Sequence, residues 1–170
     1  MGVEKQEKYN PSERMKMWEA KAQALDIFSR VCKIGKVDSK DKNSVTRYMP
    51  VVKEDGHRWK LSATKHSDGD FNIQIFWKWD KFSMYQLRYT KKTDSFSLNT
   101  FGGGKGIEKR ENLSGDELLK NVLPNFEKRL NHAEQQKIQE RKKSLNDASK
   151  LAYEEDNNDA DRLFAENGLA

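Results

Sequence analysis

The chain has 170 residues, of which 35% are hydrophobic and 35% are charged, so it is long enough for one domain but only for a small core. No apolar run approaches the roughly 18 residues of a membrane helix, and the N-terminal MGVEKQEKYN lacks the apolar segment of a secretory signal. Residues 154–170 carry six acidic side chains against Arg162, a net of −5 that leaves +10 on the rest of a chain whose total is +5. We therefore expect no membrane partner, and a basic body with an acidic end.

The first element that the sequence predicts is a helix over residues 12–34. Ser12 can cap its N-terminus, and Gly35 follows its last apolar residue, where helices commonly stop. Apolar side chains recur at helical spacing between these limits: Trp18, Ala22, Leu25, Phe28 and Cys32, with Ile27, Val31 and Ile34 beside them. We expect this stripe, together with Met15 and Met17, to pack on a sheet.

A segment rich in aromatic residues then predicts five strands separated by short turns. After a polar connection at 36–46, the strands span 47–54, 58–65, 71–79, 82–90 and 95–101. Asp55-Gly56 is a strong turn signal, and Pro50 suggests an edge strand because proline cannot donate a hydrogen bond to a neighbouring strand. The short connections predict an antiparallel meander.

Helical patterns return after the glycine-rich GGGKG at residues 102–106. Ser114 and Glu117 form a capping box that begins a helix over 115–130, and Pro124 is expected to kink this helix or to begin a second one. Residues 131–153 remain helix-prone but carry few apolar side chains. They predict an extended charged helix, either solvated or bound to a partner.

These patterns predict an α+β fold, in which a five-stranded antiparallel meander is flanked by an N-terminal helix and a long C-terminal helix. The predicted segments are a flexible N-terminus (1–11), a single α+β domain (12–130), an extended charged helix (131–153) and an acidic flexible tail (154–170). The N-terminal helix and the start of the C-terminal helix are expected to cover the sheet face that carries Trp59, Trp77 and Trp79.

The other face of the predicted sheet carries basic and hydroxyl side chains around one aromatic ring. Strand alternation places Phe76 there, beside Lys78 and away from the tryptophans. Cations follow phosphates and an exposed ring stacks on bases, so this pattern is typical of a surface for single-stranded nucleic acid. The candidate nucleic-acid-binding residues are Arg58, Lys60, Phe76, Lys78, Arg88 and Lys105, the last in the glycine-rich loop. An ordinary solvated sheet face is the alternative interpretation.

The acidic end contains a small apolar group, Leu163 and Phe164, which is a candidate site for a protein partner. A basic body with an acidic tail and an apolar tip is similar in layout to cytoplasmic single-strand-binding proteins, although the ending DADRLFAENGLA differs from theirs. Residues 45–130, a meander followed by a helix, are similar in element order to the coactivator type of single-stranded DNA-binding protein. Both resemblances rest on layout, so they imply nucleic-acid binding without assigning a family. A solvated terminus is the alternative.

The sequence indicates neither an enzyme nor a metal site. His57, His66 and His132 are scattered and have no metal-ligand spacing. Cys32 is the only cysteine and lies on the apolar stripe of the first helix, which favours an inert thiol and rules out an internal disulfide. We therefore expect no cofactor and a reducing, cytoplasmic location, which is the host cytoplasm if the chain is viral.

The leading hypothesis is a non-catalytic nucleic-acid-binding protein for single-stranded or weakly sequence-specific targets, with a regulatory acidic tail. The sequence distinguishes neither DNA from RNA nor one oligomeric state from another. The alternative is a small adaptor or inhibitor, of the kind that viruses direct against host proteins. It would bind a protein complex through residues 131–170.

Overall fold

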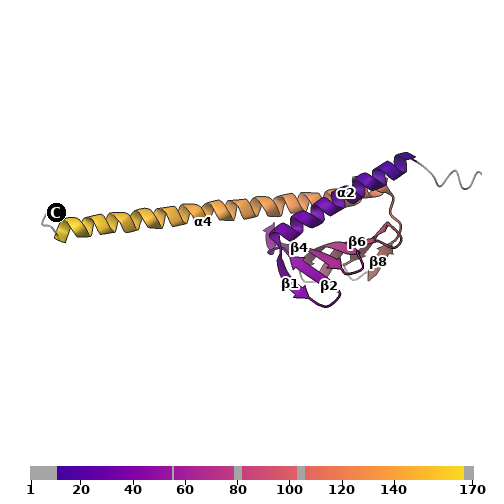
Figure 1. The fold of residues 1–170 in the computed structure, drawn as a ribbon, viewed down its shortest axis with the longest axis horizontal. Helices are drawn as coiled ribbons and strands as arrows, with labels where there is room; N and C mark the ends of the chain where they lie inside the picture. Colours follow the sequence, from indigo (N-terminus) through magenta and orange to yellow (C-terminus); the bar gives the residue numbers. More distant parts are fainter. Residues whose placement is uncertain (1–10, 55, 79–81, 103–105, 167–170) are drawn as a thin grey trace, which may run out of the picture. The chain divides into compact units, whose positions relative to one another are not determined.

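A computed structural model describes residues 11–54, 56–78, 82–102 and 106–166, with only the backbone described at positions 38, 39, 54, 78, 82 and 164. The chain divides into two compact units, residues 1–131 and residues 132–170. The first unit holds the sheet and the N-terminal helix (Figure 1).

The described part of the first unit is built on an antiparallel sheet of eight strands. The strands are β1 (Lys36–Lys40), β2 (Ser44–Tyr48), β3 (Val52–Glu54), β4 (His57–His66), β5 (Phe71–Lys78), β6 (Phe82–Thr90), β7 (Ser95–Phe101) and β8 (Ile107–Arg110). Their order in the sheet is β1-β2-β4-β5-β6-β7-β8, and β3 pairs with β4 beside β2. The predicted α+β class and antiparallel pairing are confirmed.

The prediction of five strands is wrong, because short polar strands give no alternation signal. Residues 36–46 were expected to be a connection, but they supply β1 and the start of β2; the side chain of Asp41 closes their turn by accepting from the Asn43 and Ser44 N–H groups, each at 2.7 Å. The predicted strand 47–54 is interrupted at Pro50, which has no N–H to donate. The chain leaves β4 after Met49, whose N–H donates to the Leu61 carbonyl oxygen at 2.9 Å, and pairs with it again from Val52.

The N-terminal helix α2 (Pro11–Ile34) has almost the predicted limits but a different buried face. The buried side chains are Ala20, Ala24, Ile27 and Val31. Trp18 is 57% exposed and Met15 is 66% exposed, so the expectation that both pack on the sheet is wrong. Two alanines on the inner side let the helix approach closely, which turns the larger side chains outward. The Arg14 guanidinium lies over the Trp18 ring, 5.0 Å from its centroid.

The C-terminal helical segment consists of α3 (Gly115–Glu117), the π-helical turn η1 (Leu118–Val122) and α4 (Leu123–Glu166). The predicted capping residue is confirmed, since Ser114 Oγ accepts from the Glu117 N–H at 3.1 Å. Pro124 stands at the second residue of α4, where its missing N–H is tolerated, and the turn before it widens into the π form.

The inner face of the sheet, on which α2 and the start of α4 pack, carries Trp59 and Trp77 as the sequence predicts, whereas Trp79 lies outside the described residues. Its buried side chains include Trp59, Leu61, Ile73, Ile75, Leu87, Phe96 and Leu98. Phe28 of α2 meets Phe71 at 5.3 Å between ring centroids, and Phe126 of α4 meets Tyr85 at 5.4 Å. Figure 1 shows α2 along this side of the sheet.

In the described part of the second unit, α4 continues to Glu166. It includes residues 154–166 of the acidic segment, where Arg162 pairs with Asp159 at 3.7 Å and with Glu166 at 3.9 Å. Pairs at this spacing support a helix. Whether residues 154–170 act as a separate tail stays a prediction. Within the described ranges, no helix has both the length and the apolar character that crossing a bilayer requires.

Gly115 is the point at which α2 and α3 touch through their backbones, and it gives a test of this packing. A Cβ atom on Gly115 would lie 2.4 Å from the Met17 nitrogen and 2.6 Å from the Lys16 carbonyl carbon. Gly115→Ala should therefore lower the free energy of unfolding by about 1–3 kcal/mol, measured by urea denaturation. Alanine is otherwise the better helix former by about 1 kcal/mol, so a loss identifies a steric cause.

Gly56→Ala is the matched control. No atom lies within 4 Å of a Cβ there, but the positive φ of 77° is unfavourable for alanine. We expect a smaller loss of about 1 kcal/mol. A loss at Gly115 no larger than that at Gly56 would contradict the steric explanation.

Candidate nucleic-acid interface

The face of the sheet opposite α2 and the start of α4 is here named the open face. In-register pairing across the strands assigns to it Thr46, Tyr48, Arg58, Lys60, Ser62, Thr64, His66, Asn72, Gln74, Phe76, Met84, Gln86, Arg88, Ser97, Asn99 and Lys109, together with the apolar Phe101 and Ile107 at the β7–β8 edge. Hydroxyl, amide and basic side chains dominate it. These groups can donate and accept hydrogen bonds, and the aromatic core lies on the other side of the sheet.

Tyr48, Lys60 and Phe76 form a compact aromatic and cationic cluster on the open face, here named the platform. The Tyr48 and Phe76 rings are 6.2 Å apart between centroids, at an interplanar angle of 36°. Lys60 Nζ lies 4.0 Å from the Tyr48 ring centroid and 6.0 Å from that of Phe76. Lys60 pairs directly with Phe76 across β4 and β5, so the sheet itself fixes this arrangement.

The structure brings together some of the residues that the sequence singled out. Lys60 and Phe76 share the platform, and Arg58 lies exposed two residues before Lys60 on β4, in register with Lys78 and Lys53. The side chain of Lys78 and the whole of Lys105 lie outside the described residues, so their proposed roles stay predictions.

Arg88 is also on the open face, but its charge already has a partner. Its guanidinium donates to Asp70 Oδ2 at 3.1 Å, and the Lys91 N–H donates to Asp70 Oδ1 at 2.9 Å. The Lys91 N–H, and after it Arg88, hold the pKa of the buried Asp70 carboxyl below its ordinary value. Arg88 is therefore less available to a phosphate than the sequence suggested.

Several polar atoms buried on the open face lack a hydrogen-bond partner within the described ranges. They are Ser62 Oγ, His66 Nε2, Asn72 Oδ1 and Asn99 Oδ1. All four belong to the set of alternating positions that faces away from the core. Buried unpaired polar groups are uncommon in native proteins, and each one costs free energy until a partner arrives.

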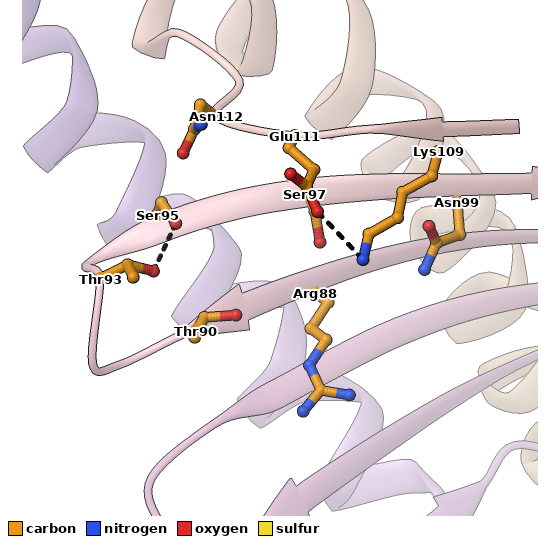
Figure 2. Close-up of a pocket in the computed structure, with 9 residues that line it drawn as sticks. All are labelled: Arg88, Thr90, Thr93, Ser95, Ser97, Asn99, Lys109, Glu111 and Asn112. Atoms are coloured by element: carbon orange, nitrogen blue, oxygen red, sulfur yellow. Dashed lines mark hydrogen bonds and ion pairs between the residues drawn. The ribbon is translucent and has the colours of Figure 1, made fainter.

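A pocket of about 450 Å³ opens on this face over β6, β7 and β8 (Figure 2). Its lining residues are Arg88, Thr90, Thr93, Ser95, Ser97, Asn99, Lys109, Glu111 and Asn112. Lys109 Nζ pairs with Glu111 Oε1 at 3.1 Å, and the Thr93 and Ser95 hydroxyl oxygens are 2.7 Å apart. The lining contains no aromatic side chain, which distinguishes the pocket chemically from the platform.

Sequence reasoning missed Tyr48 and Asn99 as members of this surface. Tyr48 was inside a predicted strand, but its face depends on pairing with Ser62, which the sequence does not reveal. Asn99 could have been found by alternation, because Phe96 and Leu98 are clear inward residues and position 99 follows them.

The remaining predicted features are placed as follows. Leu163 is 53% exposed on α4, and the side chain of Phe164 lies outside the described residues. Burial raises the pKa of the Cys32 thiol, which is the reverse of what activates a nucleophile. Among the residues that the structure describes, no group of His, Cys, Asp and Glu could hold a metal ion.

The buried Asp70 predicts an acid-dependent stability. A depressed pKa stabilises the fold above the unfolded-state value of about 3.9, and this stabilisation is lost as the pH falls through the folded-state value. Asp70→Asn should cost about 1–3 kcal/mol of unfolding free energy at pH 7 and should lose less stability than the wild type on acidification. Urea denaturation between pH 7 and pH 3 measures both effects. Glu140→Gln, at an exposed position on α4, is the control; parallel pH profiles for wild type and Asp70→Asn would refute the assignment.

No protein-family model matches the chain, and neither a curated protein nor a solved structure is significantly similar to it.

Proposed function

We propose that the chain is a non-catalytic protein that binds single-stranded nucleic acid on the open face of its sheet. The platform of Tyr48, Lys60 and Phe76 is the observation that carries this proposal. Two adjacent rings offer stacking surfaces to bases, and the Lys60 ammonium group beside them can contact a phosphate.

The surroundings of the platform support the same ligand. Amide side chains at Gln74, Gln86 and Asn99 form a row in register across β5, β6 and β7, where they can meet the edges of unstacked bases. The unpaired buried atoms of Ser62, Asn72 and Asn99 lie on the same face, and a polar ligand would supply partners for them.

Charge supports association with a polyanion. The chain outside residues 154–170 carries a net +10, and Arg58 and Lys53 stand side by side at one end of the open face. Such a distribution attracts nucleic acid over long distances and makes affinity depend on salt.

A second candidate function, a protein-binding adaptor, is favoured by a different observation. The second unit exposes large apolar side chains along α4, including Ile138 at 47%, Leu145 at 64% and Leu151 at 60%. Exposed apolar residues on a helix can serve as anchors for a partner. A partner captured equally well before and after nuclease treatment, and lost when Leu145 and Leu151 are replaced by Lys, would favour this function.

Removing either platform ring should weaken binding. Phe76→Ala and Tyr48→Ala should each reduce the affinity for a single-stranded oligonucleotide by about 1–3 kcal/mol, because a stacked base loses its ring. Fluorescence anisotropy with a labelled oligonucleotide at low salt measures the change. Tyr153→Ala is the matched control, because Tyr153 is a 67% exposed aromatic residue of α4.

The same titrations repeated at rising salt check the electrostatic part of the proposal. The affinity should fall steeply as the salt concentration rises. Lys60→Gln should reduce the slope of log affinity against log salt concentration by about one, because it removes one phosphate contact. Absence of binding at low salt, or equal affinities for Phe76→Ala and Tyr153→Ala, would refute the proposal.

Deleting residues 154–170 should raise the affinity for the oligonucleotide, because it removes a net charge of −5 from the chain. The gain should be largest at low salt and should disappear when salt screens the charges. A full-length variant with Glu154, Glu155 and Asp156 changed to the corresponding amides controls for the loss of length. Unchanged affinity in both variants would show that the acidic segment has no regulatory effect.

A further inference from the structure

The pocket over β6, β7 and β8 differs from the platform in what it can bind. Its lining is made of hydroxyl, amide and charged groups, and no ring is available there to stack a base. It nevertheless lies on the same open face, since Asn99 pairs with Gln86, which pairs with Gln74 two residues from Phe76. Asn99 is thus two strands from the platform strand β5, about 10 Å at the usual strand spacing. A nucleic acid whose bases stack on the platform therefore passes its sugar–phosphate chain within reach of the pocket.

The cations of the pocket are already balanced by carboxylates. Arg88 donates to Asp70 at 3.1 Å, and Lys109 pairs with Glu111 at 3.1 Å. The lining also contains an acceptor that lacks a donor within the described ranges, Asn99 Oδ1. Its orientation is set by the other end of the amide, because Asn99 Nδ2 donates to Gln86 Oε1 at 3.1 Å. A ligand group that donates a hydrogen bond would therefore suit the pocket better than an anion.

We infer that the pocket binds a ribose of the nucleic-acid strand, with the 2′-hydroxyl donating to Asn99 Oδ1, so that the protein prefers RNA to DNA. This inference rests on the proposed function. Within a DNA strand the sugar–phosphate backbone offers hydrogen-bond acceptors only, whereas the ribose 2′-hydroxyl is both donor and acceptor. Only the RNA backbone can therefore satisfy the buried amide oxygen.

Neighbouring groups complete the contact. The Ser97 hydroxyl lines the same pocket and can donate to the 2′-oxygen, and the guanidinium of Arg88 has donors beyond the one that Asp70 accepts. Figure 2 shows Asn99 and Lys109 close together on neighbouring strands, and Arg88 one strand farther, with its guanidinium directed away from them.

Asn99 Oδ1 is buried, so the inference requires a neighbouring side chain to move before a ligand can reach this oxygen, and we propose that this side chain is Lys109. Lys109 stands directly across from Asn99 in the β7–β8 pair, and its ion pair with Glu111 joins two side chains that are 56% and 63% exposed. An ion pair this exposed is weak. An incoming phosphate can replace the Glu111 carboxylate as the partner of Lys109 and so uncover the amide.

The test compares one oligonucleotide sequence made as RNA, as DNA and as 2′-fluoro RNA, by anisotropy with the full chain at low salt. The wild type should bind RNA about 5- to 10-fold more tightly than DNA, the contribution of one well-formed hydrogen bond. It should bind 2′-fluoro RNA like DNA, because fluorine preserves an RNA-like sugar but donates no hydrogen. Asn99→Ala should abolish the preference, so that this variant binds RNA and DNA with equal affinity.

Two further variants make the result specific. Gln74→Ala removes an amide from the same row outside the pocket and should preserve the ratio of RNA to DNA affinity. Asn99→Asp keeps an acceptor, and the Gln86 amide can turn to donate to it, so this variant should retain the preference for RNA. If Asn99→Ala folds poorly, the 2′-fluoro comparison on the wild type still tests the inference.

The outcomes separate the inference from the proposed function. Equal affinity of the wild type for RNA and DNA would overturn the inference and leave nucleic-acid binding in place. Binding of 2′-fluoro RNA as tight as that of RNA, or an unchanged ratio in Asn99→Ala, would overturn it as well. Failure to bind any of the three oligonucleotides at low salt would overturn the proposed function itself.

Discussion

The surface that the sheet offers to a ligand depends on a contact on its other side, where α2 meets the C-terminal helical segment backbone to backbone. The Gly115 N–H donates to Glu13 Oε1 at 2.6 Å, and Lys16 pairs with Asp116 at 3.1 Å. Farther along α2, Arg30 donates to Glu127 at 3.0 Å and to Asn131 at 2.7 Å. Two helices fixed to each other at both ends can shield the tryptophan-bearing face of the sheet together. The opposite face is not covered by these helices, so its side chains are mainly polar.

The central part of the fold could be predicted because burial imposes a period on the sequence. Strands β4 to β7 alternate between core and polar residues, and Ser114 carries a recognisable cap. The edge strands of the sheet could not be predicted from such a period. Strands β1 and β8 carry only one apolar residue each, Val37 and Ile107, so they show no alternation, and each pairs with a neighbouring strand through hydrogen bonds. The buried stripe of α2 was misjudged because the largest apolar residues were taken as its centre, whereas alanines permit the close approach.

The candidate interface was predictable only where it lies within the alternating strands. Lys60 and Phe76 were assigned to one face from parity alone, and their direct pairing follows from the turn between β4 and β5. Tyr48 joins them across β4 from a strand that is distant in sequence, so its contribution depends on sheet order. The ion pair between Arg88 and Asp70 likewise could not be predicted, because no pattern in the sequence indicates that these two residues are close in space. The alternation of residues along a strand therefore predicts the face on which a side chain lies. Its hydrogen-bond and ion-pair partners depend on the order and register of the strands.

The tryptophans of the described ranges lie away from the platform. Trp59 and Trp77 face the inner side, where the Arg129 guanidinium lies 5.3 Å and 4.8 Å from their ring centroids, and Trp18 projects from α2. The rings of the platform are instead a tyrosine and a phenylalanine. Indole emission from Trp59 and Trp77 should therefore report how α4 docks on the sheet. These two indole groups sense the packing of the core from the side of the sheet opposite the platform.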